Sequence, residues 1–396
     1  ITTGSSTAVT LADAMTIAND LTIASSSSLD VSGSNYAIGI KGNWSNSATF
    51  VDQSGTVTFN GGDAQTLTPG SSEFYNLTTT GSGTAVTLAA AITIANDLTI
   101  ASSSSLDVSS SNYAIGIKGD FTNSGTFTDQ AGTVTFNGGG AQTLTPGSSE
   151  FYNLTTTGSS TAVTLAAAIT IANDLTIASS SSLDVSGSNY AIGIKGDFTN
   201  SGTFTDQAGT VTFNGTGAQS ITTGGVGTDN DFNNVTITNT GTLADGSDVQ
   251  TSDAIKVTGT LDITEGQFMP ATSSDFVNIT LSNSNGKLKP ASGSSITVSG
   301  TWNNSGGSSS SFDGNSGTVT FDAGGAQSLT SDGISFYNLS TSTGSTDLTI
   351  QDALIVANDL TIASSTTLDA GSNRAISVGG DWSNSGTFTS ASNTVT

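Results

Sequence analysis

The residues that could carry out chemistry are few, and their types exclude several kinds of active site. The 396 residues contain no Cys and no His, so neither a Ser–His nor a Cys–His nucleophile can be assembled. The charged residues are 31 Asp or Glu and only 7 Lys or Arg. A carboxylate acid–base pair, or calcium-binding Asp with a basic residue, is the chemistry left to an enzyme.

The basic residues that could complete such a site concentrate in one stretch. Lys256, Lys287 and Lys289 lie within residues 236–339, which depart from the repeat described below. The sole arginine, Arg374, occupies a slot that holds Tyr190 in another repeat. A site inside the repeats would be present in several copies. We therefore expect no enzyme, and a carbohydrate-active enzyme with its site in 236–339 is a remote alternative.

One short motif matches the start of a calcium-binding nonapeptide. The sequence from Gly224 to Asp229 is Gly-Gly-Val-Gly-Thr-Asp, but Asp231 stands where an apolar residue belongs. Such a site needs successive copies whose turns share the ion, and the chain has one copy. We expect no cofactor and no metal site, although surface Asp could take up Ca²⁺ without a recognisable ligand set.

Aromatic residues recur in fixed slots and could bind sugars or a neighbouring molecule. Trp44 and Trp382 align with Phe121 and Phe198, and Trp302 follows a similar preceding sequence, Val-Ser-Gly-Thr. Because this slot accepts Phe as well as Trp, we interpret it as a wedge in the core rather than as a row of sugar-stacking rings.

The six tyrosines fall into two further slots. They are Tyr36, Tyr113 and Tyr190 in one, and Tyr75, Tyr152 and Tyr337 in the other. In the second slot a Phe precedes each Tyr, so alternation along a strand should bury the Phe and expose the Tyr. A Tyr exposed once per repeat is either a contact for a neighbouring copy or an ordinary surface residue.

The net charge of −24 limits the partners. Nucleic acids and anionic membranes need clustered Lys and Arg, so we expect neither as a ligand. No apolar run reaches the length of a membrane span. The absence of Cys in a long repetitive chain indicates that repetition, rather than disulfides, supplies stability.

Self-similarity is the main signal of the sequence. Asn-Asp-Leu-Thr-Ile begins at Asn19, Asn96 and Asn173, each 77 residues after the one before. Residues 78–142 and 155–219 differ at only three positions. The sequence is divided into repeats 1–77, 78–154 and 155–235, a divergent unit 236–339, and a partial repeat 340–396.

A finer period within the repeat predicts the fold class. Acids precede apolar strands at Glu73, Asp97, Asp120 and Glu150, with gaps of 24, 23 and 30 residues. These gaps predict about three coils per repeat and roughly 15 coils, stacked about 4.8 Å apart into a rod of roughly 70 Å. The period-2 alternation places one set of apolar residues inward. That set is Val86, Leu88, Ile92, Ile94, Leu98, Ile100, Leu106, Val108, Ile115, Ile117, Val134 and Phe136.

An all-β fold built as a parallel β-helix, or β-solenoid, is therefore expected. The main rival is a series of antiparallel β-sandwiches, one for each repeat. The solenoid is favoured because the gaps have the length of a coil and no linker separates the repeats.

At this level the chain resembles a known group of proteins. Phe-Tyr-Asn-Leu-Thr, Ala-Val-Thr-Leu, Asn-Asp-Leu-Thr-Ile, Lys-Gly-Asp-Phe-Thr-Asn-Ser-Gly-Thr-Phe and Gly-Thr-Val-Thr-Phe-Asn-Gly are similar to the strand repeats of large prokaryotic cell-surface proteins, namely filamentous-haemagglutinin-type adhesins and autotransporter passengers. The resemblance implies a secreted, right-handed parallel β-helix with a role in adhesion or surface architecture. It implies no catalytic residues.

These observations lead to one expected function and one alternative. We expect an extracellular structural or adhesive surface protein that associates with neighbouring copies in a filament or layer. The alternative is an adhesin that binds glycans or proteins through 236–339. Ile1 aligns with Thr78 and Thr396 with Thr212, so the ends are out of register. This predicts either a segment of a longer polypeptide or ends that neighbouring subunits complete in a head-to-tail polymer.

Overall fold

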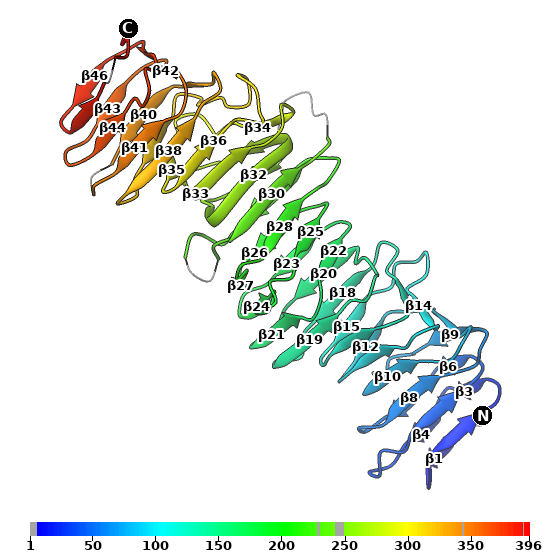
Figure 1. Ribbon diagram of the computed structural model, residues 1–396. Helices are drawn as coiled ribbons and strands as arrows, with labels where there is room; N and C mark the ends of the chain where they lie inside the picture. Colours follow the sequence, from blue (N-terminus) through cyan, green and yellow to red (C-terminus); the bar gives the residue numbers. More distant parts are fainter. Residues whose placement is uncertain (1–5, 228–229, 242–248, 343, 391) are drawn as a thin grey trace. The chain divides into compact units, whose positions relative to one another are not determined.

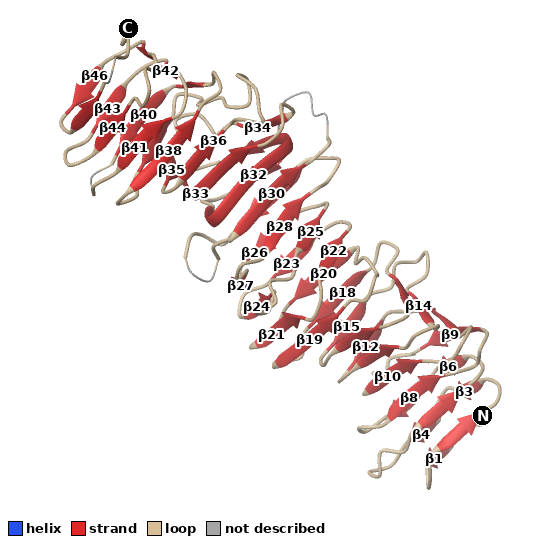
Figure 2. Ribbon diagram, in the orientation of Figure 1, coloured by secondary structure: helices blue, strands red, loops and turns tan. Residues whose placement is uncertain are grey.

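The computed structural model describes residues 6–227, 230–241, 249–342, 344–390 and 392–396. The regular elements in these ranges are β-strands, and their pairing is parallel (Figure 1). The strands are short and joined by turns (Figure 2). The chain is a parallel β-solenoid of about 18 turns with ~21 residues per turn, which confirms the predicted fold class. None of the described residues forms a helix that could span a membrane.

The chain divides into two compact units, Ile1–Tyr190 and Ala191–Thr396. In the first unit the strands follow one another around three faces in strict rotation. Face 1 consists of β2 (Met15–Ile17), β5 (Ile38–Ile40), β8 (Thr56–Phe59), β10 (Asn76–Thr79), β13 (Leu98–Ile100), β16 (Phe121–Asn123), β19 (Ala141–Thr145), β21 (Thr161–Leu165) and β24 (Ser181–Asp184).

The other two faces of the first unit are interrupted where a strand is reduced to a single bridge. Face 2 consists of β3 (Leu21–Ile23), β6 (Trp44–Asn46), β9 (Ala64–Thr68), β11 (Ala85–Leu88), β14 (Ser105–Asp107) and β17 (Thr126–Thr128), followed by Phe151, which bridges to β22 (Ile169–Ile171). Face 3 consists of β1 (Ala8–Thr10), β4 (Ser28–Asp30) and β7 (Thr49–Val51), then Phe74, which bridges to β12 (Ile92–Ile94), then β15 (Ile115–Ile117), β18 (Thr133–Phe136), β20 (Asn153–Thr156) and β23 (Leu175–Ile177).

The sequence repeat and the turn of the solenoid have different lengths. Strands β3, β13 and β23 carry the same Leu-Thr-Ile sequence, yet they lie on face 2, face 1 and face 3. One repeat contains the ten strands β3 to β12 and the bridged segment at Phe74, and three such segments make one turn. A repeat therefore spans three and two-thirds turns. Equivalent residues of consecutive repeats in the first unit consequently lie on different faces.

The solenoid therefore has about 18 turns, more than the roughly 15 that the sequence predicted. The acids counted in the sequence precede only some of the strands, so the turns between them were missed. The inward residues do stack in columns, but each stacks on a residue from another slot. Leu98, for example, lies between Leu77 and Phe121 of the neighbouring turns.

The acids that precede strands hold adjacent turns together. The Asp97 carboxylate accepts the backbone N–H of Asp120 at 2.9 Å, and the Asp120 carboxylate accepts that of Thr143 at 2.7 Å. Asn residues of the same motifs act similarly, since Asn96 donates its side-chain amide to the Asn76 side chain at 2.9 Å. These bonds satisfy backbone donors at a corner where the sheet hydrogen bonding stops.

The interior is apolar, as the alternation predicted. All of the residues expected to point inward, from Val86 to Phe136, are buried. Most of the buried polar side chains have hydrogen-bond partners. Gln142 donates to the carbonyls of Ile117 at 3.1 Å and Gly119 at 2.7 Å and accepts from Gly138 at 3.1 Å. Because its hydrogen bonds are made, burying this amide costs little free energy of folding, and it fixes the register of three chain segments.

The second unit begins with the same kind of strand and then departs from the repeat. Its first strands are β25 (Ile192–Ile194), β26 (Phe198–Asn200), β27 (Thr203–Thr205), β28 (Thr210–Phe213), β29 (Gln219–Thr222), β30 (Asn234–Thr238) and β31 (Val249–Thr251). The longest strand follows, β32 (Lys256–Met269), and it pairs with β30 along one part and with β31 along another. A register shift between Val257 and Thr260 marks where β32 and β33 (Ser274–Leu281) are out of step.

After β33, still within 236–339, the strands become short again. The remaining strands are β34 (Gly286–Leu288), β35 (Ile296–Val298), β36 (Thr301–Asn303), β37 (Thr318–Phe321), β38 (Ala326–Thr330), β39 (Ser335–Phe336), β40 (Asn338–Thr341), β41 (Asp347–Ile350), β42 (Leu354–Val356), β43 (Leu360–Ile362), β44 (Thr367–Asp369), β45 (Ile376–Val378), β46 (Trp382–Asn384) and β47 (Thr387–Thr389). β34 pairs with β32, and the others form three ladders: β35–β37–β40–β43–β46, β36–β38–β41–β44–β47 and β39–β42–β45.

Candidate functional site

The tryptophan slot lies in the core, as its acceptance of Phe indicated. Trp44 and Trp302 are 1 % and 0 % exposed, and Trp382 is half-buried. The Trp44 ring contacts Phe50 at 4.7 Å and Phe74 at 5.2 Å between ring centroids, both edge to face. The tryptophans therefore do not form a row of exposed sugar-stacking rings.

The same arrangement of three rings recurs along the chain. Its first two rings are close in the sequence and the third lies about one turn later, and in two of the other three trios Phe takes the place of Trp. The other trios are Phe121, Phe127 and Phe151; Phe198, Phe204 and Phe232; and Trp302, Phe312 and Phe336. The last ring of each trio immediately precedes the residue in the second tyrosine slot, which is why that slot has a fixed position relative to the core.

The Phe–Tyr alternation is as predicted. Phe74 and Phe151 are buried, whereas Tyr75 and Tyr152 are half-buried at the surface. Tyr337, the third copy, is more exposed at 38 %. In the other slot, Tyr36, Tyr113 and Tyr190 are half-buried.

A buried aspartate beside this tyrosine slot was not anticipated from the sequence. Asp129 and Asp206 are only 4 % and 3 % exposed. One carboxylate oxygen of each accepts a backbone N–H, from Tyr152 at 2.8 Å and from Asn233 at 2.7 Å. The other oxygen of each is buried without a hydrogen-bond partner among the described residues. Burial raises the pKa of both Asp129 and Asp206 to about 7.

The aspartate slot recurs every repeat with the same spacing. Asp52, Asp129 and Asp206 are 77 residues apart. Burial, with a smaller contribution from the charge of Glu73, raises the pKa of Asp52 to about 6. The only sign of this slot in the sequence was the 77-residue spacing. It did not predict burial, because an Asp in a Thr-Asp-Gln turn is ordinarily solvated.

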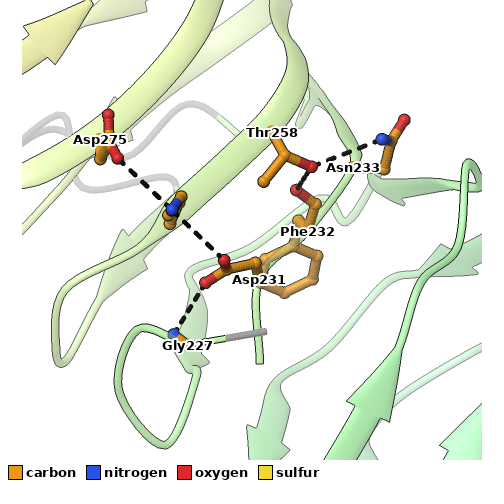
Figure 3. A network of polar contacts seen from close by, with 7 residues as sticks. Gly227, Asp231, Phe232, Asn233, Thr258 and Asp275 are labelled. Atoms are coloured by element: carbon orange, nitrogen blue, oxygen red, sulfur yellow. Dashed lines mark hydrogen bonds and ion pairs between the residues drawn. The ribbon is translucent and has the colours of Figure 1, made fainter. Parts of the chain in front are cut away.

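Lys256, one of the lysines that the sequence had singled out in the divergent stretch, lies between two carboxylates. The Lys256 ammonium lies 3.6 Å from the Asp231 carboxylate and 3.8 Å from that of Asp275 (Figure 3). Burial, followed by the charge of Asp275, raises the pKa of Asp322. A hollow of about 300 Å³ lies beside this cluster and is lined by Lys256, Asp275 and the exposed Val226.

The cluster fastens the loop that precedes it. Asp231 accepts the backbone N–H of Gly227 at 2.9 Å with one carboxylate oxygen and pairs with Lys256 through the other (Figure 3). Directly after Asp231, the N–H of Phe232 donates to the Lys256 carbonyl at 2.9 Å. Lys256 therefore lies between two carboxylates in partly exposed ion pairs, which contribute little to stability by themselves.

The glycines of the calcium-like motif are engaged by a carboxylate. Asp253 accepts the backbone N–H groups of Thr223 and Gly224 at 2.9 Å and that of Gly225 at 3.1 Å. These amides thus face an anion. Thr228 and Asp229, which complete the motif, lie outside the described residues. Among the described residues no group of three or more Asp, Glu, His or Cys is placed to hold a metal ion.

The other basic residues that the sequence had singled out, Lys287, Lys289 and Arg374, lie in separate surroundings. Lys287 lines a hollow of about 400 Å³ with Glu265. Lys289 pairs with Asp313 at 3.3 Å. Arg374 donates to the Ile350 carbonyl at 2.5 Å.

Comparison with protein-family models, with curated proteins and with solved structures found no match. The class of protein therefore follows from the fold, which is that of a parallel β-solenoid with repeating coils.

Proposed function

We propose that the chain is a structural and adhesive segment of an extracellular cell-surface assembly, without enzymatic activity, that associates with further copies of itself. One observation carries this proposal. In the first unit the near-identical repeats advance by three and two-thirds turns, so the same outward residues are presented on each face in turn. Thr22, Thr99 and Thr176, for example, project from face 2, face 1 and face 3.

This distribution suits a scaffold better than a binding groove. A groove enzyme concentrates different polar groups on one face, whereas the first unit repeats one polar surface, rich in Ser and Thr, around its axis. The strand-repeat resemblance to prokaryotic surface proteins supports an extracellular location. The excess of acids also favours association that strengthens when salt screens their repulsion.

Self-association is tested with the purified chain. Sedimentation and electron microscopy across a range of protein concentrations and of salt should show concentration-dependent growth into fibres or layers, strengthened by salt. A chain that stays monomeric at all concentrations and in high salt would refute the self-association.

A second candidate function is binding by the divergent unit 236–339. The observation that favours it is the position of the hollows beside Lys256 and Lys287, both in the stretch that departs from the repeat. Glycan-array binding by the intact chain tests this function. Binding that survives substitutions in 236–339 but is lost on substitutions in the repeats would refute it.

A further inference from the structure

One turn in the divergent unit copies the regular repeat but lacks its buried aspartate. The segment 312–321 aligns with 127–136, and Gly314 stands where Asp129 stands in the repeat. Both copies close this turn with the same backbone hydrogen bond, although Asn315 and Ser316 both have a positive φ, whereas in the repeat only Gln130 does. The N–H of Gly132 donates to the Asp129 carbonyl at 2.7 Å, and the N–H of Gly317 donates to the Gly314 carbonyl at 2.7 Å. The substitution therefore removes a side chain and keeps the hydrogen bond that closes the turn.

Removal of that carboxylate leaves a backbone donor without its acceptor. In the repeat, Asp129 accepts the N–H of Tyr152. Tyr337 is the equivalent of Tyr152, and its N–H has no acceptor among the described residues. A Cβ placed on Gly314 would lie 3.2 Å from the Tyr337 nitrogen, so a side chain at 314 would occupy the same place.

A hollow of about 440 Å³ opens at this point. Its lining includes the half-exposed Tyr337, the edge of the core residue Phe312, Gly314, the polar Asp313 and Asn315, and Ala357 of the next turn. It thus offers an aromatic ring, an apolar wall, one unpaired N–H donor and two polar side chains. This combination is typical of small-ligand sites, where few polar groups fix the orientation.

We propose that the hollow at Gly314 and Tyr337 binds the acetamido group of an N-acetylated sugar, with the amide oxygen accepting the Tyr337 N–H. This inference rests on the second candidate function, binding by the divergent unit. The amide oxygen takes the place of the aspartate oxygen, the methyl group contacts Phe312 and Ala357, and the sugar ring lies against Tyr337. The sugar hydroxyls are within the reach of Asp313 and Asn315.

A neutral acceptor fits this position better than a carboxylate. The equivalent position in the repeat disfavours negative charge, since burial raises the pKa of Asp129 to about 7. The hollow also carries a negative group of its own, because Asp313 is a carboxylate paired with Lys289 at 3.3 Å. An acetamide supplies the acceptor oxygen without adding charge.

Ligand-observed NMR with the intact chain tests the proposal, with N-acetylglucosamine, glucose and glucuronate as probes. Saturation transfer should be strongest at the acetyl methyl of N-acetylglucosamine and weak for glucose and glucuronate. Gly314→Asp restores the residue of the repeat and should weaken binding at least about tenfold, which is about 1.4 kcal/mol. Gly314 has no left-handed φ, so the variant should fold, and circular dichroism verifies this.

A second pair of variants keeps the test independent of that substitution. Tyr337→Ala should also weaken binding at least about tenfold, whereas Tyr152→Ala, in the same slot of a regular repeat, should leave it unchanged. Equal binding by Gly314→Asp and the unaltered chain, or equal transfer to glucose, overturns the proposal. If glycan-array binding persists in Gly314→Asp while its NMR signal is unchanged, the divergent unit binds elsewhere and only the inference at Gly314 fails. Preference for glucuronate would also overturn it, because the site would then select a carboxylate.

Discussion

The buried aspartate of the repeat should make the solenoid less stable as the pH rises. Burial raises the pKa of Asp129 from 3.8 to about 7, because one carboxylate oxygen is buried without a partner and only the other accepts the Tyr152 N–H. A carboxyl whose pKa is higher in the folded state stabilises the fold in its protonated form. This contribution is complete below pH 3.8 and is lost as the pH rises through about 7.

The size of the effect follows from the shift of about three pKa units. At about 1.4 kcal/mol per unit, ionisation of Asp129 in the folded state costs about 4 kcal/mol at pH 8 relative to pH 4. Asp129→Asn keeps an oxygen that can accept the Tyr152 N–H and removes the charge. The variant should match the unaltered chain at pH 4 and be more stable by up to about 4 kcal/mol at pH 8.

Hydrogen exchange measures this locally, which suits a solenoid whose turns contact only their neighbours. The free energy of opening is obtained for peptides within 126–156 at several pH values, after correction for the intrinsic exchange rate. Asp63→Asn removes one negative charge from an exposed position and controls for the change in net charge. If Asp129→Asn and the unaltered chain lose protection equally between pH 4 and pH 8, the aspartate is not the titrating group and the reasoning is wrong.

The other predictions concern the core and the corners. Ile94→Asp buries an unpaired carboxylate and should lower the stability near its own turn by several kcal/mol, whereas Thr99→Asp, which points outward, should cost little stability. Limited proteolysis distinguishes the two variants, and equal sensitivity would contradict the inward assignment of Ile94. Phe151→Ala removes one ring of a buried trio and should cost about 3–5 kcal/mol, while Tyr152→Ala should cost under about 1 kcal/mol by thermal unfolding. Asp120→Ala deletes the acceptor for a backbone N–H of the next turn and should cost about 1 kcal/mol, seen as faster exchange of that amide.

The strand pattern could be predicted because its cause is local. Alternate residues of a strand point to opposite sides, so Ile92 and Ile94 are buried and Thr93 is not. This holds regardless of how the turns of the solenoid stack. The same argument placed Phe151 inside and Tyr152 at the surface. Each of these assignments depends only on neighbours in the sequence.

The number of turns could not be predicted in the same way. A sequence repeat counts residues, whereas a turn is closed by pairing between strands distant in the sequence. The acids used as markers, at Glu73, Asp97, Asp120 and Glu150, precede strand segments on different faces: Phe74 on face 3, Leu98 and Phe121 on face 1, and Phe151 on face 2. Markers 24, 23 and 30 residues apart therefore did not all mark stacked segments: of these four described segments, those at Leu98 and Phe121 pair with each other, and the other two lie on different faces.

The burial of Asp129 and the hollow at Gly314 were beyond the sequence for a related reason. Asp129 lies in a polar turn, and it is buried because the segment at Tyr152, one turn later, covers it. Alignment of the repeats does show Gly at 314 in place of Asp. Among 48 glycines this substitution had no meaning until the structure showed which donor the missing carboxylate would have satisfied.

The offset between repeat and turn also decides what a partner can contact. Tyr75 follows the bridged segment of face 3, and Tyr152 follows that of face 2, so these equivalent tyrosines do not form a line along the first unit. A flat neighbour lying along one face would meet a given residue of the repeat only once in every three repeats. A partner that bound the repeat would therefore need to surround the first unit or accept sparse contacts. Dense recognition on one side requires residues that occur once, which is the property of the divergent unit and of its hollow at Gly314.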